Sequence, residues 1–330
     1  MRDRSIVPML ALAIAAALVV TVAYRRDSGP PPKKEKVIAI FKTAGTANAF
    51  WASVSDGVES GAQDFGFEVN VRAPRDEIYV DEQIQIVKGA IAERPAAIVL
   101  AAADFHRLVE PVRDAKARGI KVVCVDSFIE SDDADAKVGT DNFEAGQKCG
   151  AALLRRLRAE PSGAASRVAL MSYVQGSSTA IGRESGLRDA LGDKVFIAGT
   201  SYSSSDEQLA YRQAKELLDR DGELRGIAAL NLPTLLGAGR ALAESGRKGS
   251  VVLVGVDNSA EVMRYLEQGV ICDTIVQQPF NMGYISMAAV RDLLSGRHPK
   301  AYTNTGSVDI SKANMFEPEN QKLLFPVDGR

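Results

Sequence analysis

Acidic, amide and guanidinium side chains recur directly after short apolar runs in this sequence of 330 residues. Asp126, Asn231, Asp257 and Gln277 each follow such a run, and Arg183 opens a predicted helix behind a loop rich in glycine and serine. A carboxylate or an amide can bind two neighbouring hydroxyl groups at once, and an arginine adds a fork of parallel donors. The pattern therefore indicates a site that holds a small polyhydroxylated molecule by hydrogen bonds.

A second group of candidate residues lies a short distance after the first apolar run, Val37–Phe41. It contains Asn48, Phe50 and Trp51, and Trp51 is the only tryptophan of the chain. Aromatic rings can cover the C–H face of a sugar, while an amide binds its hydroxyl groups. These residues would give the site the mixture of apolar faces and polar edges that is typical of pockets for small solutes.

Each candidate also has a purely structural interpretation. Asn48 could cap a helix that begins at Ala49, and Phe50 and Trp51 could be core residues of that helix. The two aspartates could be turn formers, Asn231 fits a helix start before Pro233, and Arg183 could be a solvated surface charge. The interpretation as a binding site depends on the location of these residues, because they lie at predicted strand ends in both halves of the chain.

The elements that must position these residues alternate between strand and helix. The first series places strands at 37–41, 67–71, 96–101 and 121–126 and helices at 49–65, 81–93 and 108–118. After a helix at 143–157, the second series has strands at 167–172, 195–200, 226–230, 251–257 and 272–276 and helices at 181–191, 206–218, 234–245, 260–267 and 282–295. Because parallel strands need crossover helices, we predict an α/β fold with two doubly wound parallel sheets. Ligands of such sheets lie beyond the carboxyl ends of the strands.

The N-terminal segment differs in character from the rest of the chain. Arg2 and Arg4 precede the apolar run Ile6–Ala23, so residues 1–24 are predicted to be a secretory signal or a retained membrane anchor. Residues 25–36 are rich in proline and charge and are predicted to be a solvated linker. This segment predicts an extracytoplasmic protein, with membrane association only through the N-terminus.

Composition and motifs argue against several other functions. The formal net charge is −2, which gives no general attraction to nucleic acid. The three cysteines show no metal-binding spacing, and Cys124 lies in an apolar run typical of a buried thiol. The sequence has no G-x-S-x-G elbow, phosphate-binding loop or dinucleotide fingerprint. We therefore predict a binding protein that is not an enzyme and needs neither cofactor nor metal.

From Val37 to about Val308 the chain resembles the ribose-binding-protein group of periplasmic sugar-binding components of ABC importers. The segments that carry the resemblance are Asn48-Ala49-Phe50-Trp51, Gly139-Thr140-Asp141-Asn142, the run from Gly176 to Gly186, Asn231 before Leu236-Gly237-Ala238, Val254-Gly255-Val256-Asp257 and Thr274-Ile275-Val276-Gln277-Gln278-Pro279. The resemblance implies two lobes, 37–139 plus 278–306 and 140–277 plus 307–330, joined by a three-segment hinge. It implies a monomer and ligand contacts at Asn48, Phe50, Trp51, Asp126, Arg183, Asn231, Asp257 and Gln277.

The chain departs from this group at several positions. Ser127 and Ala101 replace an arginine and an asparagine, and Tyr202-Ser203-Ser204-Ser205 lacks an expected aromatic contact. Lys42 or Thr43 stands where a small hydroxyl residue is usual. The resemblance thus implies capture of a small sugar, polyol or similar ligand for an ABC permease, with ribose itself disfavoured. A sensory subunit that reports to a membrane receptor is the alternative. A repressor with this architecture would begin with a helix-turn-helix, where this chain has an apolar segment.

Overall fold

The computed structural model describes residues 34–44, 49–157 and 165–324. The predicted signal or anchor at 1–24, most of the linker at 25–36 and the candidate Asn48 lie outside these residues. The chain divides into two units, Met1–Glu35 and Lys36–Arg330, and all elements below belong to the second. Within 34–44, 49–157 and 165–324, no helix has the length and apolar character needed to cross a membrane.

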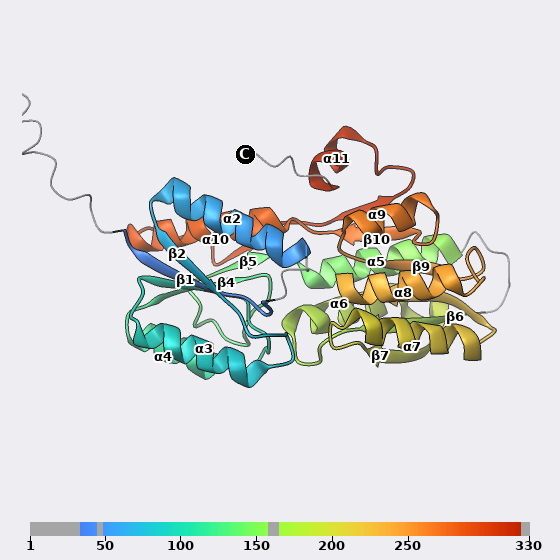
Figure 1. Ribbon diagram of the computed structural model, residues 1–330, viewed down its shortest axis with the longest axis horizontal. Coiled ribbons are helices and arrows are strands. Elements are labelled where there is room, and N and C mark those ends of the chain that lie inside the picture. The colour runs from blue at the N-terminus through green and yellow to red at the C-terminus, as the bar shows by residue number, and fades with distance from the viewer. Residues whose placement is uncertain (1–33, 45–48, 158–164, 325–330) are drawn as a thin grey trace, which may run out of the picture. The chain divides into compact units, whose positions relative to one another are not determined.

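The first sheet contains six strands that pair in parallel throughout. Its spatial order is β11 (Tyr302–Asn304), β5 (Ala136–Gly139), β4 (Lys121–Val125), β3 (Ala97–Leu100), β1 (Lys36–Ile40) and β2 (Glu68–Arg72). Along β1, Val37 and Ala39 join the core with α2 (Ala49–Phe65) and α10 (Pro279–Leu294). Ile38 and Ile40 face α3 (Val80–Ala92) and α4 (Val109–Ala117) on the other side. Successive side chains of the strand thus point to opposite faces of the sheet, and helices cover both faces, as Figure 1 shows.

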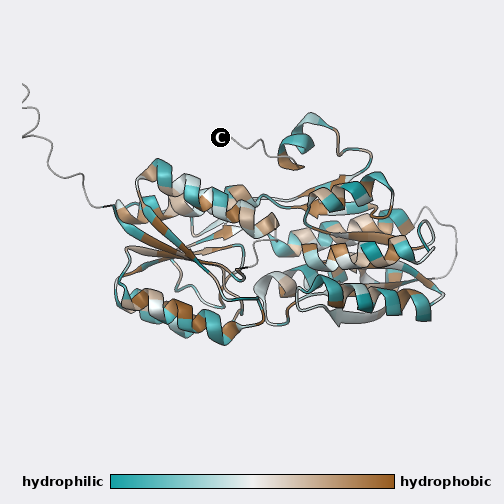
Figure 2. Ribbon diagram, viewed as in Figure 1, coloured by the Kyte–Doolittle hydropathy of each residue, from teal (hydrophilic) through white to brown (hydrophobic). Residues whose placement is uncertain are grey.

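The second sheet repeats the arrangement with a different edge. Its order is β12 (Val308–Ser311), β10 (Asp273–Val276), β9 (Val252–Val256), β8 (Leu224–Ala229), β6 (Ser166–Ser172) and β7 (Val195–Tyr202). One face carries α5 (Asn142–Leu157) and α6 (Ser178–Leu191), followed by a short 3₁₀ turn, η1 (Gly192–Lys194). The other carries α7 (Glu207–Arg220), α8 (Leu232–Glu244) and α9 (Ala260–Glu267), with α11 (Pro318–Leu324) beside them. The inner strands, such as β3 and β9, are hydrophobic and lie among helices with hydrophilic outer surfaces (Figure 2), so the predicted α/β fold is confirmed.

Three chain segments connect the two sheets. They lead from β5 to α5, from β10 to α10 and from β11 to β12. We call the first sheet with α2, α3, α4 and α10 the first lobe, and the second sheet with its helices the second lobe. The strand memberships support the predicted lobe boundaries, which remain a prediction.

The last elements of the chain were not predicted from its alternating pattern. β11 and β12 have three and four residues and carry polar side chains, so neither produces an apolar run. β12 also runs antiparallel to β10, the one antiparallel pair in the described sheets, where the pattern predicted only parallel strands. α10 begins at Pro279, three residues before the predicted start, because proline fits the first turn of a helix.

Glycines allow a close helix contact in each lobe. A Cβ on Gly283 of α10 would lie 2.2 Å from the carbonyl oxygen of Val54 in α2. A Cβ on Gly186 of α6 would lie 1.9 Å from the carbonyl oxygen of Phe143 in α5. Neither contact tolerates a larger side chain without a shift of backbone. The second contact fixes the position of α6, which carries Arg183.

Candidate functional site

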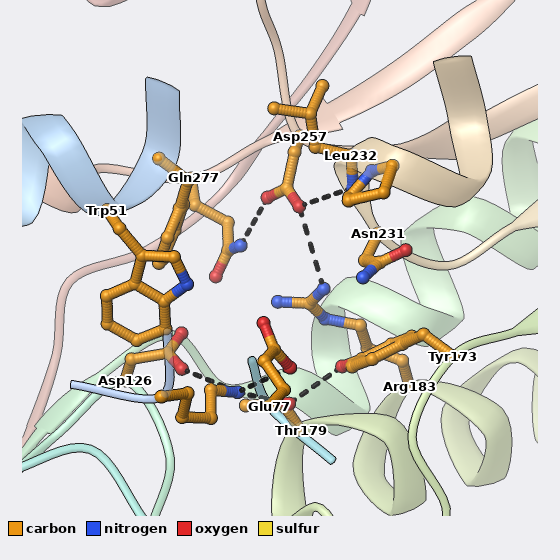
Figure 3. Close-up of a pocket in the computed structure, with 13 residues that line it drawn as sticks. Trp51, Glu77, Asp126, Tyr173, Thr179, Arg183, Asn231, Leu232, Asp257 and Gln277 are labelled. Carbon is orange, nitrogen blue, oxygen red and sulfur yellow. Dashed lines mark hydrogen bonds and ion pairs between the residues drawn. The ribbon is translucent and has the colours of Figure 1, made fainter. Parts of the chain in front are cut away.

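A cavity of about 30 Å³ lies where the carboxyl ends of the two sheets face each other. Its walls come from both lobes (Figure 3). It is lined by Lys42, Phe50, Trp51, Glu77, Asp126, Tyr173, Thr179, Arg183, Asn231, Leu232, Pro233, Asp257 and Gln277. The structure thus brings together seven of the eight predicted site residues, namely Phe50, Trp51, Asp126, Arg183, Asn231, Asp257 and Gln277. The eighth, Asn48, lies outside the described residues.

The two aspartates occupy equivalent positions in their lobes. Asp126 directly follows β4 and has φ of 60°, and Asp257 directly follows β9 and has φ of 82°. Few residues other than glycine adopt this left-handed conformation, and aspartate is among those that do so most readily. Both are therefore turn residues, as the structural interpretation held, and both also present a buried carboxylate to the cavity. Strained backbone at the strand end is common at functional sites.

Asp257 is held by groups from three segments of the second lobe. Its Oδ2 accepts a hydrogen bond of 3.0 Å from the amide of Leu232, and its Oδ1 accepts one from Nε2 of Gln277. The guanidinium Nη1 of Arg183 lies 3.9 Å from Oδ2. Burial raises the pKa of Asp257, although the Arg183 charge and the hydrogen bond from Gln277 oppose this shift.

Arg183 is only 3% exposed, so its interpretation as a solvated surface charge is wrong. Its Nε donates to Oδ1 of Asn142 at 2.9 Å, and its Nη1 donates to the carbonyl oxygen of Leu230 at 2.8 Å. The guanidinium also lies 5.8 Å from the centre of the Tyr173 ring. These contacts fix the fork so that it points into the cavity (Figure 3).

Asn231 has two roles at once. It is the N-cap of α8, and its Oδ1 accepts a hydrogen bond of 3.2 Å from the amide of Thr234. Its Nδ2 donates to Oγ of Ser205 at 3.0 Å. The residue is buried and lines the cavity, so the helix-start interpretation and the site interpretation are compatible.

The first lobe contributes a cluster of buried charges around Lys42. The Lys42 ammonium lies 3.2 Å from Oδ2 of Asp126 and 3.9 Å from Oε2 of Glu77, and all three side chains are at least nine-tenths buried. Burial by itself lowers the pKa of Lys42, but the two carboxylates outweigh it and raise the pKa above its ordinary value. Burial also raises the pKa of Glu77, and the ammonium opposes this only in part. Lys42 also reaches across to the second lobe, where Nζ donates to Oγ1 of Thr179 at 3.5 Å.

The aromatic wall belongs to the first lobe. Trp51 is 5% exposed and stacks on Phe41 with ring centres 5.4 Å apart, while Phe50 meets it edge-on at 5.1 Å. The Lys42 ammonium lies 5.6 Å from the centre of the Trp51 ring. Trp51 is therefore a core residue that also lines the cavity.

Four polar residues that line the cavity were not among the predicted site residues. Lys42 was noted only as a departure from the resemblance, and Thr179 only as part of a matching segment. Tyr173 directly follows β6 and would have been found by the same strand-end reasoning. Glu77 lies in the loop between β2 and α3, five residues beyond the strand end, and carries no such signal.

The other departures lie near the cavity without lining it. Ser127 is buried, and its hydroxyl donates to the carbonyl oxygen of Ala102 at 2.8 Å. Ala101 is buried, and its carbonyl accepts from Nε2 of Gln83.

Cys124 is a buried thiol, as predicted, and burial raises its pKa to about 12. In the part of the chain that the structure describes, no three His, Cys, Asp or Glu side chains lie together in a way that could hold a metal ion.

The cavity walls can both donate and accept hydrogen bonds around a ligand. Lys42, Arg183 and Asn231 offer donors, while the three carboxylates and the Gln277 amide offer acceptors. The Trp51 and Phe50 rings add an apolar surface. This combination suits a small molecule with several hydroxyl groups on an apolar ring.

Comparisons with known proteins agree with this geometry. Residues 38–298 match the model of the periplasmic binding protein domain. The D-allose-binding periplasmic protein of Escherichia coli is 26% identical over 255 residues, which cover 74% of this chain and 81% of that protein. The D-ribose/D-allose-binding protein of Pseudomonas aeruginosa is 27% identical over 279 residues, covering 82% and 85%.

Solved structures match over nearly the whole of their length. A carbohydrate transporter solute-binding protein from Agrobacterium radiobacter, in complex with D-arabinose, has a TM-score of 0.85 and 25% identity, and the match covers 89% of this chain and 99% of that one. An ABC transporter solute-binding protein from Agrobacterium vitis, with bound D-fucose, has a TM-score of 0.83 and 29% identity, covering 88% and 99%. The prediction of a solute-binding protein that is not an enzyme is confirmed, and the chain belongs to the periplasmic binding protein family.

Proposed function

We propose that this protein captures a small neutral sugar or sugar-like polyol between its two lobes and delivers it to an ABC importer. The observation that carries the proposal is the composition of the cavity, in which carboxylate, amide and guanidinium groups from both lobes surround a space walled by Trp51 and Phe50. The relatives named for D-allose, D-ribose, D-arabinose and D-fucose support the sugar class.

The size of the cavity bears on the mechanism. A volume of about 30 Å³ has room for water, whereas pockets for small ligands measure roughly 300–1,000 Å³. Admission of a sugar therefore requires the walls to separate. The three connecting segments provide a hinge for this motion, and closure completes the hydrogen bonds around the ligand.

The same proposal places the protein outside the cytoplasm. Residues 1–24 act as an export signal or a membrane anchor, 25–36 act as a spacer, and the lobes work as a monomer. The periplasmic relative supports this location. Cell fractionation, followed by sequencing of the mature N-terminus, distinguishes cleavage from anchoring.

The emission of Trp51, the only tryptophan, provides the test of sugar binding. The purified protein is titrated with D-allose, D-ribose, D-arabinose, D-fucose, D-galactose and a polyol series. We expect a saturable change in emission with one structural class at micromolar concentration, because Trp51 lines the cavity. If isothermal titration calorimetry and emission both show no binding by a folded sample, sugar capture is wrong.

A further inference from the structure

Two buried acceptor atoms in the cavity have no hydrogen-bond partner among the described residues. They are Oε2 of Glu77 and Oε1 of Gln277. Both residues line the cavity, and their polar groups point into the space between Trp51 and Arg183 (Figure 3). A buried acceptor without a donor is costly. These two oxygens therefore stand ready to accept hydrogen bonds from a ligand.

The charged groups around the cavity favour a ligand that donates hydrogen bonds. Three carboxylates, those of Glu77, Asp126 and Asp257, face two cations, Lys42 and Arg183. Lys42 lies closest to Asp126, at 3.2 Å, and Arg183 lies 3.9 Å from Asp257. Each cation thus already lies beside a carboxylate of its own lobe, and the carboxylates outnumber the cations.

Glu77 lies farther from Lys42 than Asp126 does, and its carboxylate also has a hydrogen bond with Trp51, while Oε2 has no partner. Its contact with Lys42 is 3.9 Å long and is not a hydrogen bond, whereas Asp257 accepts hydrogen bonds from Leu232 and Gln277. Glu77 also differs from the other two in position, because it lies in the β2–α3 loop and does not directly follow a strand. It extends from this loop into the cavity (Figure 3).

Building on the sugar-binding function proposed above, we propose that Glu77 is a specificity-determining residue that accepts a hydroxyl donor of the ligand and excludes sugars bearing a carboxylate or a phosphate. A hydroxyl group satisfies Oε2 of Glu77, and a second hydroxyl satisfies Oε1 of Gln277. An anionic group in the same small space would meet three carboxylates and leave both acceptors without donors. Like charges so close together in a buried site repel strongly.

Pairs of a neutral sugar and an anionic derivative test this proposal on the unmodified protein. D-Galactose and D-galacturonate differ at C6 alone, where a hydroxymethyl group is replaced by a carboxylate. D-Ribose and D-ribose 5-phosphate form a second pair. We expect the acidic member to bind at least about 100-fold more weakly than its neutral partner at pH 7, measured by isothermal titration calorimetry.

An acidic member that binds within tenfold of its neutral partner would overturn the role of Glu77 while leaving sugar capture intact. If no neutral sugar of the pairs or of the panel above binds, the sugar-binding function itself fails, and this inference fails with it.

The variant Glu77→Gln removes the charge but keeps a carbonyl acceptor. We expect the ratio of the affinities for D-galactose and D-galacturonate to fall by about tenfold in this variant. Glu82→Gln is the matched control, because Glu82 is exposed on α3 and pairs with Arg75 outside the cavity. If a folded Glu77→Gln protein shows the same ratio of affinities as the unmodified protein, the proposal is contradicted. If that variant does not fold, the affinities of the unmodified protein for the sugar pairs still test the role of Glu77.

Discussion

The two walls of the cavity are held in place by different kinds of contact. In the second-lobe wall, Asp257, Arg183 and Asn231 each bind a main-chain group at the end of a strand or the start of a helix. These main-chain groups belong to the regular structure of the lobe. Each side chain is therefore anchored to the fold itself, in addition to its contacts with neighbouring side chains.

The charged groups of the first-lobe wall are positioned mainly by one another. Lys42 contacts Asp126 and Glu77 through side-chain charges, and its long chain reaches both from the end of β1. Loss of Lys42 leaves both carboxylates buried without their cation. A single substitution in the second-lobe wall should therefore cost less stability than one at the centre of the first-lobe wall, which behaves as one coupled unit.

The largest expected effect follows removal of Lys42. Lys42→Met leaves Asp126 and Glu77 buried without their cation, and breaking a buried ion pair in this way costs about 3–5 kcal/mol. The free energy of unfolding, measured by urea denaturation, should fall by that amount. Lys88→Met is the control, because Lys88 is exposed on α3 and its loss should change stability by about 0.5 kcal/mol or less.

A double variant sharpens the same comparison. Adding Asp126→Asn to Lys42→Met removes one of the uncompensated charges and should restore part of the lost stability. A loss below about 1 kcal/mol in Lys42→Met, or strict additivity in the double variant, would mean that the first-lobe wall is not a coupled unit.

The second prediction concerns Asp257 in the second-lobe wall. Asp257→Ala removes a carboxylate that faces the ligand and should weaken sugar binding tenfold or more, about 1–3 kcal/mol. Binding is followed by Trp51 emission. Asp257→Asn retains an acceptor oxygen and should lose less affinity. Unchanged affinity in Asp257→Ala would remove Asp257 from the site.

The smallest expected effect is a change in the pH dependence of stability. Burial raises the pKa of Glu77 above its ordinary 4.5, so the folded protein holds this proton more tightly than the unfolded chain does. The stability linked to this group is thus fully present below pH 4.5 and is lost as pH rises through the raised pKa. Glu77→Gln cannot lose a proton, so its free energy of unfolding should exceed that of the unmodified protein by up to about 2 kcal/mol at pH 7.

The difference between the two curves isolates Glu77, because Asp257, whose pKa is also raised, is present in both proteins. Urea denaturation at a series of pH values from 4 to 8 measures the free energy of unfolding of both proteins. Parallel curves for the two proteins would show that Glu77 bears no such cost in the folded state.

Local sequence was sufficient to predict most of the elements. The helix predicted at 49–65 matches α2 and ends at Gly66, which has φ of 76° as a helix-terminating glycine should. Apolar runs located the long strands because parallel strands buried on both faces are apolar along their whole length. β11 and β12 were missed because short edge strands with polar side chains have no such pattern.

The candidate site was predictable where a residue follows a strand. Asp126, Asp257 and Gln277 could be located from their position in the sequence, because the carboxyl ends of parallel strands meet at one edge of a sheet. Glu77 could not, since only the folded β2–α3 loop brings it 3.9 Å from Lys42. Whether Arg183 is a surface charge or a buried one was also undecided until the α5–α6 contact placed it inside.

The sequence by itself determined the α/β architecture and the set of polar residues at the strand ends, because hydrophobic periodicity and the alternation of strands and helices can be read along the chain. Only the tertiary structure decided how the charges of this set are distributed. The ion cluster of Lys42, Glu77 and Asp126 forms from three separate segments of the first lobe. The pairing of such groups depends on distances across the fold, and these are set by the packing of helices on the sheets.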